Sequence, residues 1–313
     1  MNRSERLLRA TGAACLAAVL RLAVPAAATA AGDAPAPAAG PAYVAEVDAW
    51  HAQRVERLRS ETGWLTLVGL DELDPATVND VGSAPEALVR LIDKAPARVG
   101  QLACAGGQWT FTVADGVAVT TGDPAQPVTT LALKTDREGA PTALDCGTLQ
   151  FFVIERDGRF FLRVKDREAE VRRHFTGIDR YPVNERWRLI ARLEPGPATV
   201  KVPNVLGQAT DTPSPGVLVF TVDGRECRLT PTGGPGEELF LVFGDATNGK
   251  GTYGGGRFLS AAAPGPDGVV TLDFNQAYNP PCVFTPYATC PLPGKDNTLP
   301  VAIEAGEMVW GDH

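Results

Sequence analysis

Two Asp-Gly pairs constrain the fold of this chain more than any other feature. Asp157-Gly158 and Asp223-Gly224 each separate two short runs rich in Val, Phe, Leu and Ile. An Asp-Gly pair adopts the positive backbone angles that a tight β-hairpin requires. No strong helical pattern follows the first pair, which argues against alternating βαβ units. The sequence therefore predicts a mainly β, antiparallel fold.

Further short apolar runs, bounded by Gly, Pro and Asp, are typical of strands. They predict strands at residues 109–113, 128–133, 149–155, 160–165, 188–193, 200–202, 217–222, 239–243, 269–274 and 301–304. Near the start, Val44, Val47, His51, Val55 and Leu58 recur at spacings of three and four, which predicts an amphipathic helix over residues 42–60. We expect antiparallel sandwich or barrel modules preceded by one helix.

The first thirty residues are typical of an export signal. Three arginines precede an apolar run over residues 10–20, and Ala28-Thr29-Ala30 resembles a cleavage site. The run is shorter than the roughly 20 apolar residues of a membrane-spanning helix, and no later run is comparable. We expect a signal peptide over residues 1–30, an Ala/Pro linker over residues 31–41, no membrane span, and a periplasmic or secreted protein.

The charge balance excludes one class of partner. The chain has 29 basic and 37 acidic residues, and four basic residues and one acidic residue lie in the first thirty. Their removal leaves 25 basic against 36 acidic residues, a net charge of −11. A nucleic-acid-binding protein needs a basic stripe or face. The sequence has none, so we expect no nucleic-acid partner.

The remaining length suits one large β domain or two smaller ones. We expect a first module over residues 42–170, made of the helix and a small β-sandwich. A second β module should span residues 171–313 and carry the functional site. Length leaves open whether the two modules share one core.

Five cysteines follow the signal, and an odd number leaves at least one thiol unpaired. Cys282 and Cys290 lie in a proline-rich loop and are the candidates for a disulfide in an oxidising compartment. The alternatives are a buried apolar thiol and a nucleophile, which needs a basic neighbour. The chain has only three histidines, so we expect neither a metal site nor a Ser/His/Asp triad, and no cofactor.

A glycine-rich stretch over residues 245–257 follows an apolar run. Glycines let the backbone approach a ligand closely, and Arg257 can grip a carboxylate or phosphate. Asp245 and Tyr253 lie in the same stretch. Two alternatives stay open: a calcium loop, whose spacing does not fit the helix-loop-helix pattern, and a long hairpin connection capped by Asp245.

The densest set of polar side chains lies at residues 273–307, DFNQAYNPPCVFTPYATCPLPGKDNTLPVAIEAGE. On a strand, Asp273 and Asn275 face the same way, and two carboxylates in one pocket can divide acid and base roles. We predict Asp273 and Glu304 as catalytic groups. The predicted ligand-binding residues are Asp245, Tyr253, Arg257, Asn275, Asn279, Tyr287 and Asn297. Tyr278 and Glu307 belong to the same cluster. The alternative is that the asparagines bond the backbone of their own turns.

This segment resembles the C-terminal signature of a bacterial and haloarchaeal family catalogued as a domain of unknown function. Met308 departs from the pattern, because the family carries a basic residue there. The resemblance implies family membership over most of the chain and names no reaction. Further matching motifs are Gly63-Trp64-Leu65-Thr66-Leu67-Val68-Gly69-Leu70, Arg163-Val164-Lys165-Asp166, Tyr181-Pro182, Val202-Pro203-Asn204 and residues 243–259.

Residues 81–166 also resemble a forkhead-associated domain in outline, with Val81-Gly82-Ser83 followed by strands and a final hairpin. That resemblance implies a β-sandwich. Ser83 stands where the forkhead-associated family places an arginine, and no histidine occurs between residues 52 and 173. Phosphopeptide binding is therefore not expected.

Two functions from different classes are compatible with these patterns. The first is binding or hydrolysis of a small anionic or carbohydrate molecule in the C-terminal β module, with Arg257 as the anion anchor. The second is a noncatalytic structural or interaction protein of the cell envelope, in which the loop from Cys282 to Cys290 is a rigid plug. The first requires Arg257, Asn279 and Glu304 to converge in one concave pocket.

Overall fold

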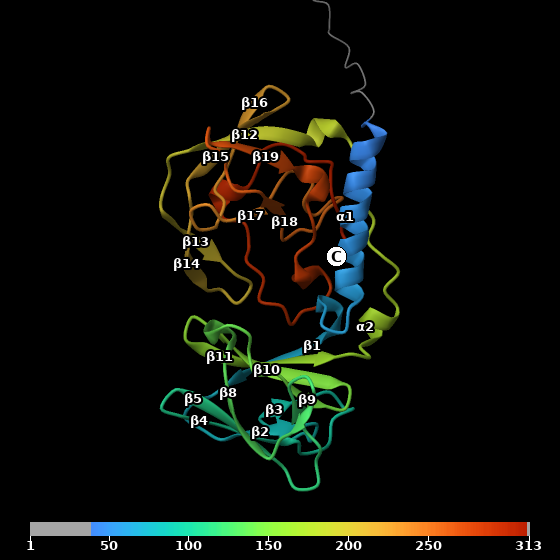
Figure 1. The fold of residues 1–313 in the computed structure, drawn as a ribbon, viewed down its shortest axis with the longest axis vertical. Coiled ribbons are helices and arrows are strands. Elements are labelled where there is room, and N and C mark those ends of the chain that lie inside the picture. The colour runs from blue at the N-terminus through green and yellow to red at the C-terminus, as the bar shows by residue number, and fades with distance from the viewer. Residues whose placement is uncertain (1–38, 312–313) are drawn as a thin grey trace, which may run out of the picture. The chain divides into compact units, whose positions relative to one another are not determined.

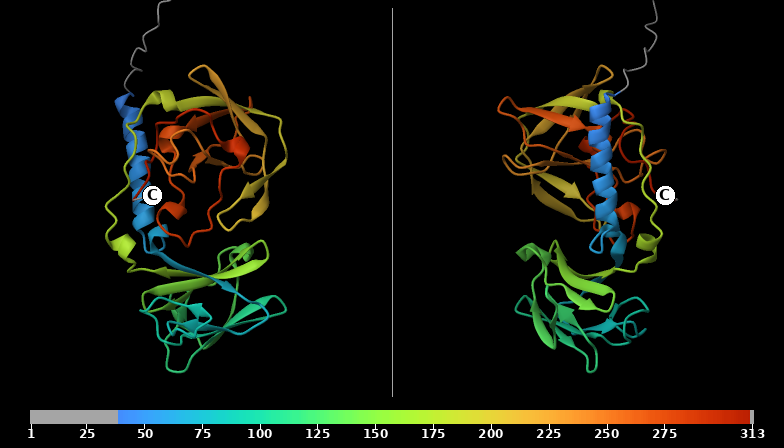
Figure 2. Two further views of the ribbon diagram at one scale, coloured as in Figure 1. Left: turned by 180° about the vertical axis from the view of Figure 1, so that it is seen from behind. Right: turned by 45° about the vertical axis from the view of Figure 1, so that its right-hand side comes forward.

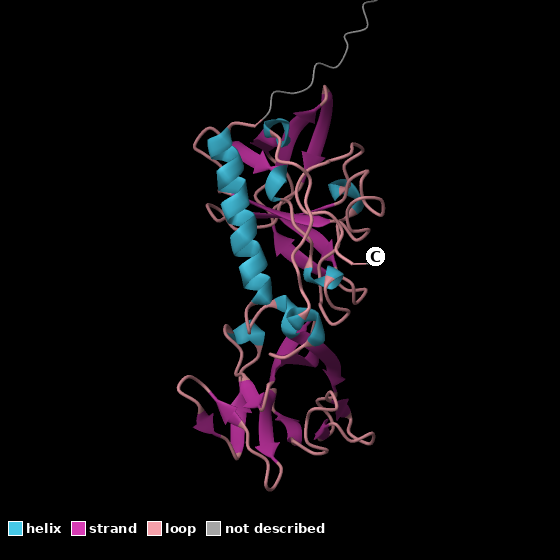
Figure 3. Cartoon of the chain, turned by 90° about the vertical axis from the view of Figure 1, so that its right-hand side faces the viewer, coloured by secondary structure: helices cyan, strands magenta, loops and turns pink. Residues whose placement is uncertain are grey.

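The computed structural model describes residues 39–311, which open with one long helix, α1 (Pro41–Arg59) (Figures 1 and 3). Pro41 stands in the first turn, where its missing N–H costs no hydrogen bond. The helix predicted over residues 42–60 is confirmed. The predicted signal peptide and most of the predicted linker lie outside the described residues.

The buried face of α1 differs from the predicted stripe. Tyr43, Val47, Arg54 and Leu58 are buried, whereas His51 is only half-buried. An arginine is rarely buried unless its charge is paired. The position of Arg54 therefore points to a partner inside the protein.

Two sheets form the region from β1 to β11, with strand orders β1-β11-β10-β9-β6-β7 and β3-β2-β4-β5-β8. Phe111 of β5 and Phe151 of β10 meet edge to face across them, with ring centroids 5.4 Å apart. The two sheets thus enclose one core. The strands are β1 (Leu67–Leu73), β2 (Asn79–Gly82), β3 (Val89–Arg90), β4 (Gly100–Ala105), β5 (Gln108–Val113), β6 (Thr120–Thr121), β7 (Gln126–Pro127), β8 (Thr130–Leu133), β9 (Leu144–Cys146), β10 (Leu149–Arg156) and β11 (Arg159–Asp166).

A four-stranded sheet, ordered β16-β15-β12-β19, and the hairpins β13-β14 and β17-β18 form the C-terminal region (Figure 2). Phe274 packs against Phe220 of β15 and Phe243 of β17, with centroid distances of 5.8 and 5.3 Å. It therefore joins the sheet to the second hairpin. The strands are β12 (Arg188–Glu194), β13 (Thr199–Pro203), β14 (Ala209–Pro213), β15 (Val217–Val222), β16 (Arg225–Leu229), β17 (Leu239–Phe243), β18 (Arg257–Ala261) and β19 (Val269–Asp273).

Both Asp-Gly pairs form the predicted tight turns. Asp157 and Asp223 have φ angles of 49° and 48°, the left-handed region that Asp tolerates better than most residues. They connect β10 to β11 and β15 to β16, and both pairs are antiparallel. The mainly β, antiparallel fold class is confirmed.

One predicted strand is wrong. Residues 301–304 run as irregular backbone, and side chains rather than a neighbouring strand bond the segment. Ile303 N donates to Asp245 Oδ1 at 3.2 Å, and Ile303 O accepts from Arg257 Nη2 at 2.8 Å. Alternating apolar residues here fill the core beside β17 without forming a ladder.

Short helical turns connect the strands, and the described residues, 39–311, belong to one compact unit. The two largest of its four hydrophobic clusters are drawn from residues 73–164 and from residues 187–305. The predicted boundary after residue 170 lies between these two ranges. Across residues 39–311, no helix is both long and apolar enough to cross a membrane. The short turns are η1 (Trp64–Thr66), η2 (Asp136–Glu138), α2 (Glu170–Arg173), η3 (Glu185–Trp187), η4 (Phe274–Gln276), η5 (Pro281–Val283) and η6 (Lys295–Asn297).

Candidate functional site

Arg257, the predicted anion anchor, is an internal structural residue. Its side chain is fully buried, and Nη2 pairs with Asp245 Oδ2 at 2.9 Å. Nη1 bonds Ala305 O, and Nη2 also bonds Ile303 O. Burial lowers the pKa of Arg257, while Asp245 opposes that shift. An external anion would have to displace Asp245 and the backbone of residues 303–305, so the prediction of an anion anchor is wrong.

The glycine-rich stretch folds onto itself. Asp245 Oδ1 accepts from Thr247 N at 2.8 Å and from Thr247 Oγ1 at 2.6 Å. Asn248 Nδ2 donates to Thr252 Oγ1 and Tyr253 O. Tyr253 is half-buried against the cluster around Phe175 and Phe284. The hairpin connection is the alternative that this geometry matches, and no metal-ligating cluster occurs in the described part of the chain.

Asp273 and Asn275 do face the same way, as predicted, but they hold α1. Both carboxylate oxygens of Asp273 accept from Tyr43 Oη, at 2.7 and 2.8 Å. Asn275 Nδ2 donates to Tyr43 Oη at 2.9 Å and to Asn184 O at 3.0 Å. Burial, followed by the bond to Asp273, raises the pKa of Tyr43. This cluster anchors the start of the helix and engages both carboxylate oxygens of Asp273.

The remaining predicted residues do not converge. Asn279 is fully buried, and its Nδ2 donates to Met308 O at 2.7 Å. Glu304 is exposed to solvent. Tyr287 is 38% exposed and lines a different cavity, together with Asp71. Because Arg257 and Asn279 are buried and Glu304 is exposed, the predicted single pocket is not formed.

Cys282 and Cys290 are neighbours and free thiols, like the three other described cysteines. Cys282 N donates to Cys290 Sγ at 3.1 Å. The hydrogen bond between the two side chains lowers the pKa of Cys282 and raises that of Cys290. The loop therefore brings the predicted disulfide partners together, and the bond itself stays a prediction.

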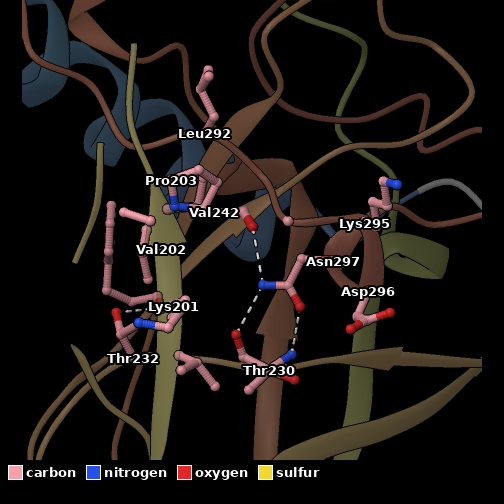
Figure 4. Close-up of a pocket in the computed structure, with 14 residues that line it drawn as sticks. Lys201, Val202, Pro203, Thr230, Thr232, Val242, Leu292, Lys295, Asp296 and Asn297 are labelled. Atoms are coloured by element: carbon pink, nitrogen blue, oxygen red, sulfur yellow. Dashed lines mark hydrogen bonds between the residues drawn. The ribbon is translucent and has the colours of Figure 1, made fainter. Parts of the chain in front are cut away.

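Asn297 lies in the wall of a cavity of about 470 Å³ between the β13-β14 hairpin and β17 (Figure 4). Its Nδ2 donates to Thr230 O at 2.9 Å and to Val242 O at 3.1 Å, and its Oδ1 accepts from Thr230 N at 2.8 Å. The ammonium group of Lys201 pairs with Asp211 at 3.1 Å. The rest of this wall is largely apolar. Asn297 thus holds two strands together and presents no spare polar atom to a ligand.

A second cavity, of about 360 Å³, has a different lining, and we name it the tryptophan–arginine cavity. Its residues come from α1, η1, β18, η4 and the segments beside them. Three are aromatic, two are arginines, and the others are polar. They are Trp50, Arg54, Arg57, Trp64, Glu238, Ser260, Gln276 and Tyr278.

Arg54 is fixed within this cavity wall. Its Nε pairs with Glu307 Oε1 at 3.3 Å, and its Nη2 donates to Asn279 O at 2.9 Å. Its guanidinium lies 4.8 Å from the centre of the Tyr278 ring. Glu307 Oε2 in turn accepts from Asn279 N at 2.7 Å. Burial raises the pKa of Glu307 and outweighs the opposing effect of Arg54.

Other polar groups of the cavity are unengaged. Arg57, Glu238 and Gln276 make no side-chain hydrogen bond or ion pair with any residue from 39 to 311, and neither does Nη1 of Arg54. Arg57 and Glu238 are exposed and Gln276 is half-buried, so their polar groups are accessible to a ligand. Convergent unsatisfied groups beside aromatic walls are the usual composition of a small-molecule site.

Sequence reasoning missed most of this cavity. Trp50, Arg54 and Arg57 are spaced by four and three residues and therefore share one face of α1. That spacing is visible in the sequence, but the sequence alone does not show which residues face it. Tyr278 and Glu307 were recognised in the C-terminal cluster. Their partners on the helix lie more than two hundred residues away in sequence.

Comparison with protein families matches residues 173–308 to the family described as "Protein of unknown function (DUF1684)". No curated protein matches the chain. Among solved structures, the chain is similar to the solution NMR structure of an uncharacterized protein from Haloarcula marismortui. The two are 29% identical, the match covers 44% of this chain and 78% of that one, and the TM-score is 0.37. The predicted resemblance is thus confirmed over the matched span: residues 173–308 match the model of the DUF1684 family of proteins of unknown function.

Proposed function

We propose that this protein is exported and binds a small organic anion in the tryptophan–arginine cavity. The observation that carries the proposal is the pairing of a fixed arginine, Arg54, with an unengaged one, Arg57, beside three aromatic side chains. Export is supported by the N-terminal sequence pattern.

Arg54 and Arg57 would bind the negatively charged group of the ligand. Glu307 and Asn279 hold Arg54 in place, so little conformational freedom is lost when a ligand meets its unpaired Nη1. Arg57 is exposed and has no competing acidic partner among the described residues. A guanidinium presents parallel donors that match a carboxylate or phosphate.

The aromatic residues supply contact area. Trp50 and Trp64 are half-buried, and the ring of Trp50 lies 6.3 Å from that of Tyr278. Rigid aromatic side chains bury a large area at a small entropic cost. Tyr278 lies against the guanidinium of Arg54, which is buried, and a low exposure to water strengthens the attraction for an anion.

The lining favours binding over hydrolysis. Hydrolysis of a glycoside by the usual route needs two carboxyl groups about 5–9.5 Å apart. Glu238 is the one carboxylic residue in the lining of this cavity. Asp273 is engaged by Tyr43, and Glu307 is fully buried behind Arg54. No acid/base pair therefore faces the cavity.

We also propose that Cys282 and Cys290 form a disulfide after export. The approach of Cys282 N to Cys290 Sγ supports it, since the loop already places the residues side by side. Alkylation of the unfolded, unreduced protein should then modify two cysteines fewer than alkylation after reduction, as measured by intact mass. Equal modification in the two samples would exclude the bond.

Isothermal titration calorimetry tests the anion site directly. The probes are benzoate, D-glucuronate and D-galacturonate, with benzamide, D-glucose and D-galactose as neutral counterparts. We expect at least one anion to bind with a Kd below about 1 mM, at least about tenfold more tightly than its neutral counterpart. Arg57→Gln should weaken that binding about tenfold or more.

Arg59→Gln is the matched control. It removes the same charge from the last turn of the same helix, but Arg59 bonds Phe175 O and lies over the Phe175 ring, outside the cavity. We expect the control to bind like the wild type. The proposal fails if none of the anions binds, or if both variants weaken binding equally.

A further inference from the structure

The polar residues beside the arginines restrict the kind of anion. Glu238 and Gln276 line the same cavity and have no side-chain partner in the described part of the chain. A carboxylate accepts hydrogen bonds, and a carboxamide both donates and accepts. Glu238 is exposed and Gln276 is half-buried, so both can bond a ligand that enters from solvent. A ligand that carried only an apolar ring and a charge would make no use of these groups. Hydroxyl groups would satisfy both.

The charge pattern excludes a cationic or multiply charged ligand. Arg54 and Arg57 line the cavity, and the guanidinium of Arg163 lies 5.4 Å from the centre of the Trp64 ring. Two guanidinium groups and one carboxylate, Glu238, line the cavity, and this balance disfavours a cation. The carboxylate of Glu238 also repels a second anionic group of the ligand at that end of the cavity. The ligand should therefore carry one negative charge at one end.

The aromatic rings fit a saturated ring as well as a flat one. One face of Tyr278 is covered by Arg54, at 4.8 Å, and Trp64 is covered by Arg163. With guanidinium groups on those faces, the rings are poor binders of a second cation. Their remaining surface is apolar and suits the C–H face of a pyranose, whose hydroxyls project sideways.

We infer that the ligand of the tryptophan–arginine cavity is an acidic sugar, a pyranose that carries one carboxylate. The inference rests on the proposed function and specifies its ligand class. Arg54 and Arg57 hold the carboxylate, the tryptophans contact the ring, and Glu238 and Gln276 bond the hydroxyls. At about 360 Å³, the cavity lies near the lower end of small-molecule sites, which suits a single sugar unit.

The test compares four probes by calorimetry: a hexuronate (D-glucuronate or D-galacturonate), the matching neutral hexose, benzoate and glycine betaine. We expect the hexuronate to bind at least about tenfold more tightly than each of the others. Glu238→Ala and Gln276→Ala should each weaken hexuronate binding about three- to tenfold and leave weak benzoate binding unchanged. Asp296→Ala, at an exposed residue of the other cavity, is the control and should change neither.

The outcomes separate the two proposals. If benzoate binds as tightly as the hexuronate and depends on Arg57, the anion site stands and the acidic-sugar inference fails. Tighter binding of glycine betaine would show a zwitterion site and would also overturn the inference. Unchanged hexuronate binding in both alanine variants would show that Glu238 and Gln276 do not bond the sugar hydroxyls, and would overturn the inference. If no anion binds, both proposals fail.

Discussion

Two arginine centres in this protein use the same residue types in opposite ways. Arg257 is fully buried, and Asp245 and two backbone carbonyls take its terminal nitrogens. Arg54 is buried on one side, against Glu307, while Nη1 has no partner in residues 39–311 and Arg57 beside it has none at all. The first centre is closed, and the second is open.

The difference shows what separates a structural ion pair from a binding site. A buried charge must be compensated, and a fully compensated charge has nothing left for a ligand. Composition cannot distinguish the two cases, because both centres contain arginine, carboxylate and tyrosine. The distinguishing property is whether solvent, and hence a ligand, can reach the guanidinium: Arg257 is fully buried, whereas Arg57 is exposed.

The largest expected effect comes from opening the closed centre. Asp245→Ala removes the counter-charge of a fully buried arginine, so we expect a loss of about 3–5 kcal/mol in the free energy of unfolding. Urea-induced unfolding measures it. Asp211→Ala breaks the exposed pair with Lys201 and should cost less than about 1 kcal/mol. A small loss at Asp245 would show that Arg257 reaches solvent and that the comparison is wrong.

Glu307→Gln should have an intermediate effect. Two donors, Arg54 Nε and Asn279 N, converge on the two carboxyl oxygens of Glu307, and a glutamine has only one acceptor oxygen. One donor loses its partner, which costs about 1–3 kcal/mol. The hexuronate should also bind less tightly, because Arg54 is held less firmly.

The pH dependence of that variant tests the burial of Glu307. Because burial raises its pKa above the ordinary 4.5, the folded protein holds this proton more tightly than the unfolded chain does. The stability that Glu307 contributes is full below the unfolded-state pKa and falls as the pH rises through the folded-state pKa. Glutamine does not titrate. The stability difference between wild type and variant should therefore shrink as the pH rises above about 4.5, and a growing difference would contradict the raised pKa.

The smallest expected effect on stability is at the open centre. Arg57→Gln removes an exposed side chain with no partner among the described residues. The free energy of unfolding should therefore change by less than about 0.5 kcal/mol. Thermal and urea unfolding of the variant used for the binding experiment measure it. A loss above about 1 kcal/mol would place Arg57 with the structural residues.

The sequence predicts this fold well where the signal is local. The Asp-Gly turns and their flanking strands depend on neighbouring residues, and both hairpins form as expected. The strand predicted at residues 301–304 is wrong, because alternating apolar residues indicate that a segment is buried and do not show that its backbone pairs with another strand. Whether a buried segment bonds a strand or the side chains of Asp245 and Arg257 is decided by residues about fifty positions away.

The candidate site was harder to predict for the same reason. The asparagines of the C-terminal segment do bond backbone, but Asn297 bonds Thr230 and Asn275 bonds Asn184, far from their own turns. The cavity combines one face of α1 with Tyr278 and Gln276, and only the folded chain brings these together. Polar density in sequence identified the right segment and the wrong residues within it.

The side chains that bond the irregular C-terminal backbone also have a consequence for association between molecules. Exposed strand edges invite pairing with a second chain, and many proteins must block them. Asn297 occupies the carbonyl of Val242 at the outer side of β17, and Arg257 and Asp245 occupy the backbone groups of Ile303. These backbone groups are already bonded to side chains, so a second strand would have to displace those bonds before it could pair with them.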